Sequence, residues 1–485
     1  MTALFVLTLA IPAVCAVVTW LVRSPRAVLG ICVVGSAACA VGTVVCAREA
    51  FSAPLFAIGR QLMLDSLAAY HALLVVGVFV MSSVYACYYF APAIADGSFD
   101  ARKARRFGAL WFLFLGSMLL TLASNNAGLM WVALEGTTIT SALLVCLDRD
   151  KPAVRAAWTY LLMCSVAIAL ALIGIITLCA EAQRVGPDSS SIFLWTTLRK
   201  LAPRLNPGTV RLAFIFAFVG FGTKAGLAPM HSWLPEAHGH APTPVSAVLS
   251  GVLLNCALYC LSRFLPVVAQ SNPGWTTSVL VPFGILSMVV AAAFIVHEHD
   301  IKRLLAYHTV EHMGIIVLAL GFGAFPAALF HTFNHSVCKM LTFFCGGALA
   351  QRYGTRDMSH MHGTLRREAV AGGGLLIGLF ALIGMPPFSI FMSELWIAVV
   401  GIEGGHVAAV VAFFCAAGLV FIAAFRHAIE MTWPQKDAPE PNGPRGRVGL
   451  GLVAVPLALL FLIGVWMPLH VSNMLASAAS VIGGQ

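Results

Sequence analysis

The run LFHTFNHSVCKML carries three titratable side chains inside an apolar stretch, His331, His335 and Lys339. Their four-residue spacing places them on one face of a helix, where they would span about 12 Å. A charged group at membrane depth is costly, roughly 2.5 kcal/mol or more for lysine, so such groups usually line a protein interior or a hydrated path. A lone histidine would be read as an interior hydrogen-bonding group, but three titratable groups in register favour a proton relay.

Three more charged residues, Glu135, Lys224 and Glu394, lie within other apolar segments. Two of them adjoin Gly and Pro: Lys224 in GTKAGLAPMHSWLP and Glu394 at the end of GMPPFSIFMSE. Gly and Pro interrupt the backbone hydrogen bonds of a helix, which is tolerated at membrane depth only where the freed groups face protein or a cavity. Paired interrupted helices in two halves of a chain indicate an inverted-repeat transporter.

The composition predicts an all-α integral membrane protein. Of 485 residues, 60% are hydrophobic and 10% charged, which is far more apolar than a soluble domain. A bilayer core requires roughly 20 residues per helix, and the first apolar segment lacks a signal-peptide cleavage site, so we expect it to be retained. We predict about fourteen spans, at 2–22, 27–47, 66–90, 108–124, 126–147, 155–180, 209–231, 242–268, 277–297, 301–321, 325–350, 369–393, 395–426 and 448–470.

These spans form one membrane domain, 1–485, with surface connectors at 181–208 and 427–447. The interrupted spans are five apart, and an odd offset inverts one unit relative to the other. We therefore expect two inverted five-helix repeats, at 108–268 and 277–426.

Glu135 lies in the fifth predicted span and Glu311 in the tenth, so the same offset of five spans makes them equivalent positions in the two repeats. Glu311 is accordingly either a relay member or the structural partner of a neighbouring lysine, and His312 joins it as a candidate. Glu236, His238 and His240 follow the first interrupted segment, and we expect them in a loop on the outer side.

The positive charges orient the chain. Assigning the 29 Lys and Arg to alternate loops puts 19 on one side and 8 on the other, and the positive-inside rule makes the richer side cytoplasmic. Both termini then face outward from a prokaryotic inner membrane. The net charge of +9 reflects topology and argues for no nucleic-acid partner, because the basic residues sit at span ends next to the lipid bilayer.

The chain shows no sequence signature of a cofactor or metal site. Its 13 cysteines lie scattered in apolar spans without a Cys-x-x-Cys pair, and buried cysteine behaves as a small hydrophobic residue. Nucleotide-binding glycine loops and nucleophile elbows are also missing from the sequence. We expect no cofactor in this chain.

Long motifs bear a family resemblance. The run FVGFGTKAGLAPMHSWLPEAHGHAPTPVSAVLSGVLLNCALYCLSRF, then HDIKRLLAYHTVEHMGII and the His/His/Lys stripe, resemble the antiporter-like proton-pumping subunits of respiratory complex I and of multi-subunit cation/proton antiporters. VEHMGI and LLNCALY look most like the F component of hydrogenase-4.

The resemblance implies a role for each candidate residue. Glu135 and Lys224 would be the ion pair of a first half-channel. Lys339, with His331 and His335, would be the central relay, and Glu394 the exit acid of the second half-channel.

Two positions depart from the family pattern. Asn255 and Thr159 stand where sister subunits have lysine, so the link between the two half-channels would run through water or through Asn255 itself.

The resemblance also implies partners. The leading hypothesis is a proton-translocating subunit of an energy-converting oxidoreductase of the hydrogenase-4, formate hydrogenlyase or complex I type. Its other membrane and soluble subunits would carry the iron–sulfur clusters or nickel–iron centre. The alternatives are a transport module without redox partners, either a sodium/proton antiporter subunit or the membrane half of an inorganic-carbon uptake complex, and a purely structural anchor.

Overall fold

The computed structural model describes residues 1–186, 191–433, 443 and 448–484; parts of both predicted surface connectors lie outside these residues. Within these residues, the regular secondary structure is helical apart from one antiparallel hairpin. The elements are α1 Thr2–Leu21, α2 Pro25–Ala50, β1 Leu55–Ala57, β2 Leu62–Leu64, α3 Ser66–Tyr89, α4 Ala91–Ala95, α5 Ala101–Ala123, α6 Ala127–Val145, α7 Lys151–Val185, α8 Trp195–Leu201, η1 Ala202–Arg204, α9 Pro207–Lys224, α10 Trp233–His240, α11 Thr243–Val248, η2 Leu249–Leu253, α12 Leu254–Ser271, α13 Trp275–Ile295, α14 Ile301–Gly321, α15 Phe325–Tyr353, η3 Met358–His360, α16 Thr364–Arg367, α17 Ala369–Leu382, α18 Ser389–Glu403, α19 Val407–Thr432, α20 Leu450–Val465 and α21 Leu469–Gly483.

Polar side chains begin many of the long helices. Asp65, Asp100, Asp150, Asn206 and Asp300 each accept hydrogen bonds from first-turn backbone N–H groups of α3, α5, α7, α9 and α14. An N-terminal cap of this kind satisfies donors that have no partner within the helix. These polar caps therefore mark where apolar spans begin.

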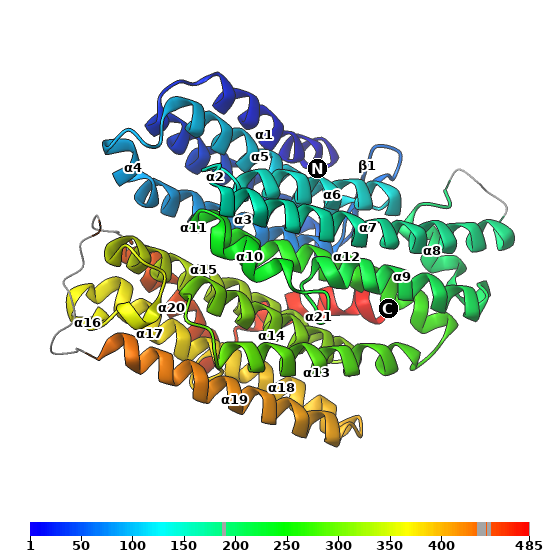
Figure 1. Cartoon of the computed structure of the whole chain (residues 1–485). Coiled ribbons are helices and arrows are strands. Elements are labelled where there is room, and N and C mark those ends of the chain that lie inside the picture. The colour runs from blue at the N-terminus through cyan, green and yellow to red at the C-terminus, as the bar shows by residue number, and fades with distance from the viewer. Residues whose placement is uncertain (187–190, 434–442, 444–447, 485) are drawn as a thin grey trace.

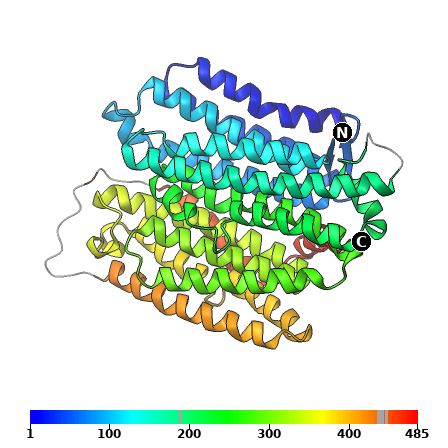
Figure 2. The same cartoon turned by 45° about the vertical axis from the view of Figure 1, so that its right-hand side comes forward.

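Ten helices in the described part of the chain are long and apolar enough to cross a membrane, and α20 and α21 form a further pair bent by 85°. The all-α membrane class predicted from composition is confirmed. Figures 1 and 2 show these helices side by side, with α1 at one edge and α19 at the other. The apolar windows of α14 and of the α11–η2–α12 span are wholly buried, so their polar residues face protein and not lipid.

Two helices break where the sequence places Gly and Pro. α9 ends at Lys224 and α10 begins at Trp233, while α17 ends at Leu382 and α18 begins at Ser389. Gly226 and Gly384 take left-handed φ values of 79° and 69° within these breaks, which glycine adopts without steric cost.

The predicted boundary between the twelfth and thirteenth spans, at residue 394, is wrong, because Glu394 lies inside α18. The helix ends instead at Glu403, where Gly404 and Gly405, the latter with φ of 78°, lead into α19. A glycine in the left-handed conformation is a common helix terminator. The predicted fourteenth span, 448–470, also runs past the end of α20 at Val465 into α21.

The outer-loop placement of Glu236, His238 and His240 was also wrong. All three lie on α10, and His238 is fully buried. The Glu236 carboxylate lies 2.7 Å from the guanidinium of Arg303. Arg303 belongs to the end of the bundle that holds most of the Lys and Arg residues, here called the basic end. The reason is that α10 resumes the span after the break and carries these residues to the basic end.

Candidate functional site

The first buried cluster forms where α6, α7 and α9 meet. The Lys224 ammonium is fully buried and donates to the hydroxyls of Thr138 at 3.0 Å and Tyr160 at 2.7 Å. The Glu135 carboxylate accepts from Thr138 at 3.1 Å and from Ser165 at 2.5 Å. Lys224 and Glu135 form no direct ion pair within 4.0 Å; the Thr138 hydroxyl contacts both and bridges them.

The helix break fixes the position of Lys224. Lys224 is the last residue of α9, and the indole N–H of Trp233 at the start of α10 donates to the Thr223 carbonyl at 2.9 Å. The Trp233 ring also stacks on Tyr160 with centroids 4.6 Å apart. A carbonyl freed by the break is thus satisfied by protein, as membrane depth requires, and the same residue holds the tyrosine against the lysine.

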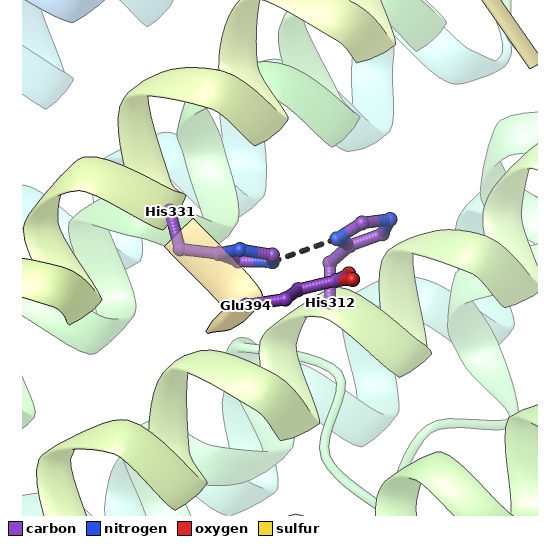
Figure 3. Close-up of side chains that lie close together, drawn as sticks. All are labelled: His312, His331 and Glu394. Atoms are coloured by element: carbon purple, nitrogen blue, oxygen red, sulfur yellow. Dashed lines mark hydrogen bonds between the residues drawn. The ribbon is translucent and has the colours of Figure 1, made fainter. Parts of the chain in front are cut away.

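The second cluster joins α14, α15 and α18. His312 Nδ1 and His331 Nε2 lie 2.8 Å apart, and His331 Nδ1 lies 2.9 Å from Ser393 Oγ. Figure 3 shows the two imidazoles facing one another with the Glu394 side chain beside them. Both histidines are buried. Neutral imidazole donates through one nitrogen and accepts through the other, so this chain can pass a proton from ring to ring.

Glu394 completes this group. One donor atom each from His312, His331 and Glu394 lies within 4.8 Å of the others, and a Cβ built at Gly384 would overlap the Glu394 carboxylate. Such a trio could hold a metal ion, but two imidazole nitrogens on one tetrahedral zinc would sit about 3.3 Å apart. The 2.8 Å contact fits a shared proton better.

The His/His/Lys stripe does not form a hydrogen-bonded chain along α15. The Lys339 ammonium donates to the Leu305 carbonyl at 2.7 Å, and His335 Nε2 lies 3.2 Å from the Ser250 carbonyl. His335 approaches His312 through ring contact, with centroids 5.1 Å apart. The contacts of the stripe therefore run sideways to neighbouring helices.

Glu311 has a histidine partner. Its carboxylate lies 3.0 Å from His308 Nδ1, three residues earlier on α14, and no lysine lies within ion-pair distance of it among the described residues. The Lys339 ammonium lies beyond ion-pair distance but close enough to act on this carboxylate electrostatically.

Asn255 lies between the two clusters. Its amide donates to Ser336 Oγ on α15 and to the Gly251 carbonyl, both at 2.8 Å. Gly251 belongs to the π-helical turn η2, and π-turns often mark functional sites. On the other side, Leu254 lies within 3.6 Å of a Cβ built at Gly226, in the break after Lys224.

Thr159 is the neighbour of Tyr160 on α7, but it forms no hydrogen bond with either cluster in the described part of the chain. It lines a cavity of about 610 Å³ at the basic end, together with Lys151, Arg155, Glu236 and His240.

Sequence reasoning missed five residues that the structure places in the clusters: Thr138, Tyr160, Ser165, His308 and Ser393. His308 could have been found, because it precedes Glu311 by three residues on a helix and so shares its face. Thr138 likewise follows Glu135 by three residues and shares its face. Ser393 only adjoins Glu394 in sequence, and adjacent residues point to different sides of a helix. Tyr160 carries no sequence signal, since its role depends on how α7 packs against α9.

The described structure is thus a multi-pass membrane protein with helices broken after Lys224 and before Glu394 and with a titratable cluster near each of these breaks. These features define the class of antiporter-like membrane subunits. Residues 124–420 match the family described as NADH:quinone oxidoreductase/Mrp antiporter, TM. The chain belongs to this family.

Several of its relatives are named as components or subunits. The chain is 37% identical over 341 residues to "Hydrogenase-4 component F homolog" of Methylacidiphilum infernorum, covering 69% of this chain and 71% of the relative. It is 31% identical to "Hydrogenase-4 component B" of Escherichia coli, covering 71% and 51%. It is 29% identical to "Na(+)/H(+) antiporter subunit A1" of Staphylococcus aureus, covering 70% and 43%.

Solved structures share the fold. A chain of the archaeal membrane-bound sulfane sulfur reductase superposes with a TM-score of 0.87 at 21% identity, covering 99% of this chain and 97% of that chain. A chain of the Mrp complex of Dietzia sp. superposes with a TM-score of 0.80 at 20% identity, with the same coverage.

Proposed function

We propose that this chain is a proton-translocating membrane subunit of an energy-converting oxidoreductase complex, of the hydrogenase-4 or complex I type. The observation that carries the proposal is the buried His312–His331–Ser393 hydrogen-bond chain beside Glu394. Titratable groups are expensive to place at membrane depth, and where they occur they usually mark an ion or proton path. The names of the 37% and 31% identical relatives support the hydrogenase-4 assignment.

The relay would begin at Glu135 and Lys224 and cross by way of Asn255 to Lys339 and the histidines. Buried polar atoms without a hydrogen-bond partner among the described residues support a water-linked crossing, since such atoms normally bond water when no protein group is near. They include Asn255 Oδ1, His335 Nδ1, His312 Nε2 and His308 Nε2. Glu394 would release the proton.

Equivalent helix packing supports the two inverted repeats, 108–268 and 277–426, within a domain of about fourteen spans. α5 packs on α6 as α13 packs on α14, α6 on α7 as α14 on α15, and α7 on α9 as α15 on α17. Glu135 on α6 and Glu311 on α14 then hold equivalent places.

The redox chemistry of the complex would reside in partner subunits that carry iron–sulfur clusters or a nickel–iron centre, since this chain offers a relay and no redox motif. Other membrane and soluble subunits would complete the assembly in a prokaryotic inner membrane, with both termini of this chain outward.

The test replaces Lys339 in the complex reconstituted into vesicles. Lys339→Met keeps an apolar stem and deletes the protonation site, so proton uptake should fall at least tenfold while the subunits still co-purify. Lys339→Arg is the matched control, because a guanidinium keeps the charge but does not release its proton. Both variants should be inactive if Lys339 relays protons; pumping by either one in an assembled complex would remove Lys339 from the path.

A sodium/proton antiporter subunit is the second candidate, favoured by the 29% identity to "Na(+)/H(+) antiporter subunit A1". The same vesicles separate the two: a sodium gradient alone should drive proton movement in an antiporter and should leave a redox-driven pump inactive.

A further inference from the structure

A groove of about 620 Å³ lies between α1, α5 and α6, away from both titratable clusters. Figure 1 shows these three helices next to one another at one edge of the bundle. Its apolar walls include Val17 and Trp20 of α1, Ala109 and Leu113 of α5, and Leu143 of α6. The small Ala109 forms the floor, and the large side chains on either side remain exposed. The large apolar side chains that line the groove thus face out of the bundle, where a membrane-spanning protein meets lipid.

Two arginines, Arg106 and Arg149, close the basic end of this groove. Among the described residues neither guanidinium has a hydrogen-bond or ion-pair partner, whereas Lys103, one turn before Arg106, pairs with Asp148 at 2.8 Å. Arg149 also adopts a left-handed φ of 58°, a conformation uncommon for a residue other than glycine. Two cations with no ion-pair partner among the described residues thus lie at the basic end of an apolar groove.

We propose that this groove binds an anionic phospholipid, with the phosphate on Arg106 and Arg149 and an acyl chain along α5. Arginine's planar fork matches phosphate oxygens, and basic pockets between membrane helices on the cytoplasmic side bind acidic lipid headgroups. The stretch of α5 that lines the groove, from 106 to 113, is about 10 Å long. This length can hold part of an acyl chain and is greater than the length of a free phosphate ion. Trp20 lies near the same end, as aromatic residues do at membrane interfaces.

The test measures binding of phosphatidylglycerol and phosphatidylcholine to the delipidated full-length chain by native mass spectrometry. The wild type should prefer phosphatidylglycerol, and Arg106→Gln with Arg149→Gln should weaken its binding about thirtyfold, as expected for two cations near a lipid phosphate. Arg102→Gln is the matched control, because Arg102 is exposed on the same turn region and does not line the groove. Arg106→Lys combined with Arg149→Lys should recover much of the phosphatidylglycerol binding.

A second arm tests the acyl chain. Ala109→Trp fills the floor and should abolish the preference without changing any charge, and soluble glycerophosphoglycerol should bind weakly or not at all. Equal binding of phosphatidylglycerol by the double Gln variant would overturn the proposal. So would equal binding of the headgroup alone, which indicates a free-anion site. Cross-linking of a cysteine at Leu113 to another subunit in the assembled complex would also overturn it, since a protein would then occupy the groove.

Discussion

The Lys224 ammonium and the Glu135 carboxylate share one hydroxyl, that of Thr138. Because they interact through a common partner, their substitutions should not act independently. We expect Glu135→Gln and Lys224→Met each to reduce proton uptake in vesicles about tenfold or more, and the double variant to be no worse than the more severe single one. Losses that add in the logarithm of the rate would show that the two charges work separately.

Ser393 holds His331 in place, because its hydroxyl lies 2.9 Å from His331 Nδ1. Ser393→Ala should leave that buried nitrogen without this partner, at a cost of about 1–3 kcal/mol, and proton uptake should fall roughly tenfold. Ser262→Ala is the matched control, since the buried Ser262 hydroxyl bonds only within its own helix, to Leu258. Equal losses in both variants would indicate a general packing defect.

Sequence spacing found most of the charged and imidazole residues of the two clusters, but not the hydroxyl groups and contacts that link them. Glu135, Lys224, His331 and Glu394 stand out because charged and imidazole groups are rare in apolar spans. The links between them run between helices, from His331 to His312 and from Lys224 through Thr138. Spacing along one helix says nothing about such contacts, which depend on tertiary packing.

At the scale of elements, the break between α17 and α18 positions Glu394. Gly384 has φ of 69° and leaves no space for a Cβ beside the Glu394 carboxylate. Gly384→Ala should therefore displace that carboxylate and reduce proton uptake several-fold, beyond the roughly 1 kcal/mol of backbone strain that alanine meets at positive φ. Gly323→Ala provides the control, because Gly323 has φ of 76° and nothing within 4 Å of its Cβ. Equal effects of the two substitutions on proton uptake would show that only strain matters.

Hydropathy located the regular spans, and local chemistry explains where it failed. α14 begins and ends at the predicted residues 301 and 321, since Asp300 caps its start. Between 369 and 426 the apolar run continues through two helix ends, so composition alone could not tell the break before α18 from the Gly404–Gly405 end after it. The π-helical turn η2 has no local signal either.

At the scale of the whole molecule, one end of the bundle gathers the ion pairs between connections. Lys103 pairs with Asp148 at 2.8 Å, and Arg356 with Asp300 at 3.1 Å. The first pair joins the first turn of α5 to the connection after α6, and the second joins the connection before α14 to the one after α15. Within each pair, the two segments lie at the same end of the bundle, as the count of Lys and Arg assumes.

The orientation can be tested with single cysteines at opposite ends. Ser98 is exposed beside the basic helix start at Asp100, and Ser52 is exposed just after α2, at the other end of the bundle. In a background where the exposed Cys415 is replaced by Ser, a membrane-impermeant thiol reagent should label Ser98→Cys only in inside-out vesicles and Ser52→Cys only in intact cells. The positive-inside rule predicts this pattern, because the membrane potential and insertion machinery retain Lys and Arg in the cytoplasm. The reverse pattern would invert the molecule and exchange the sides from which the two half-channels take up and release protons.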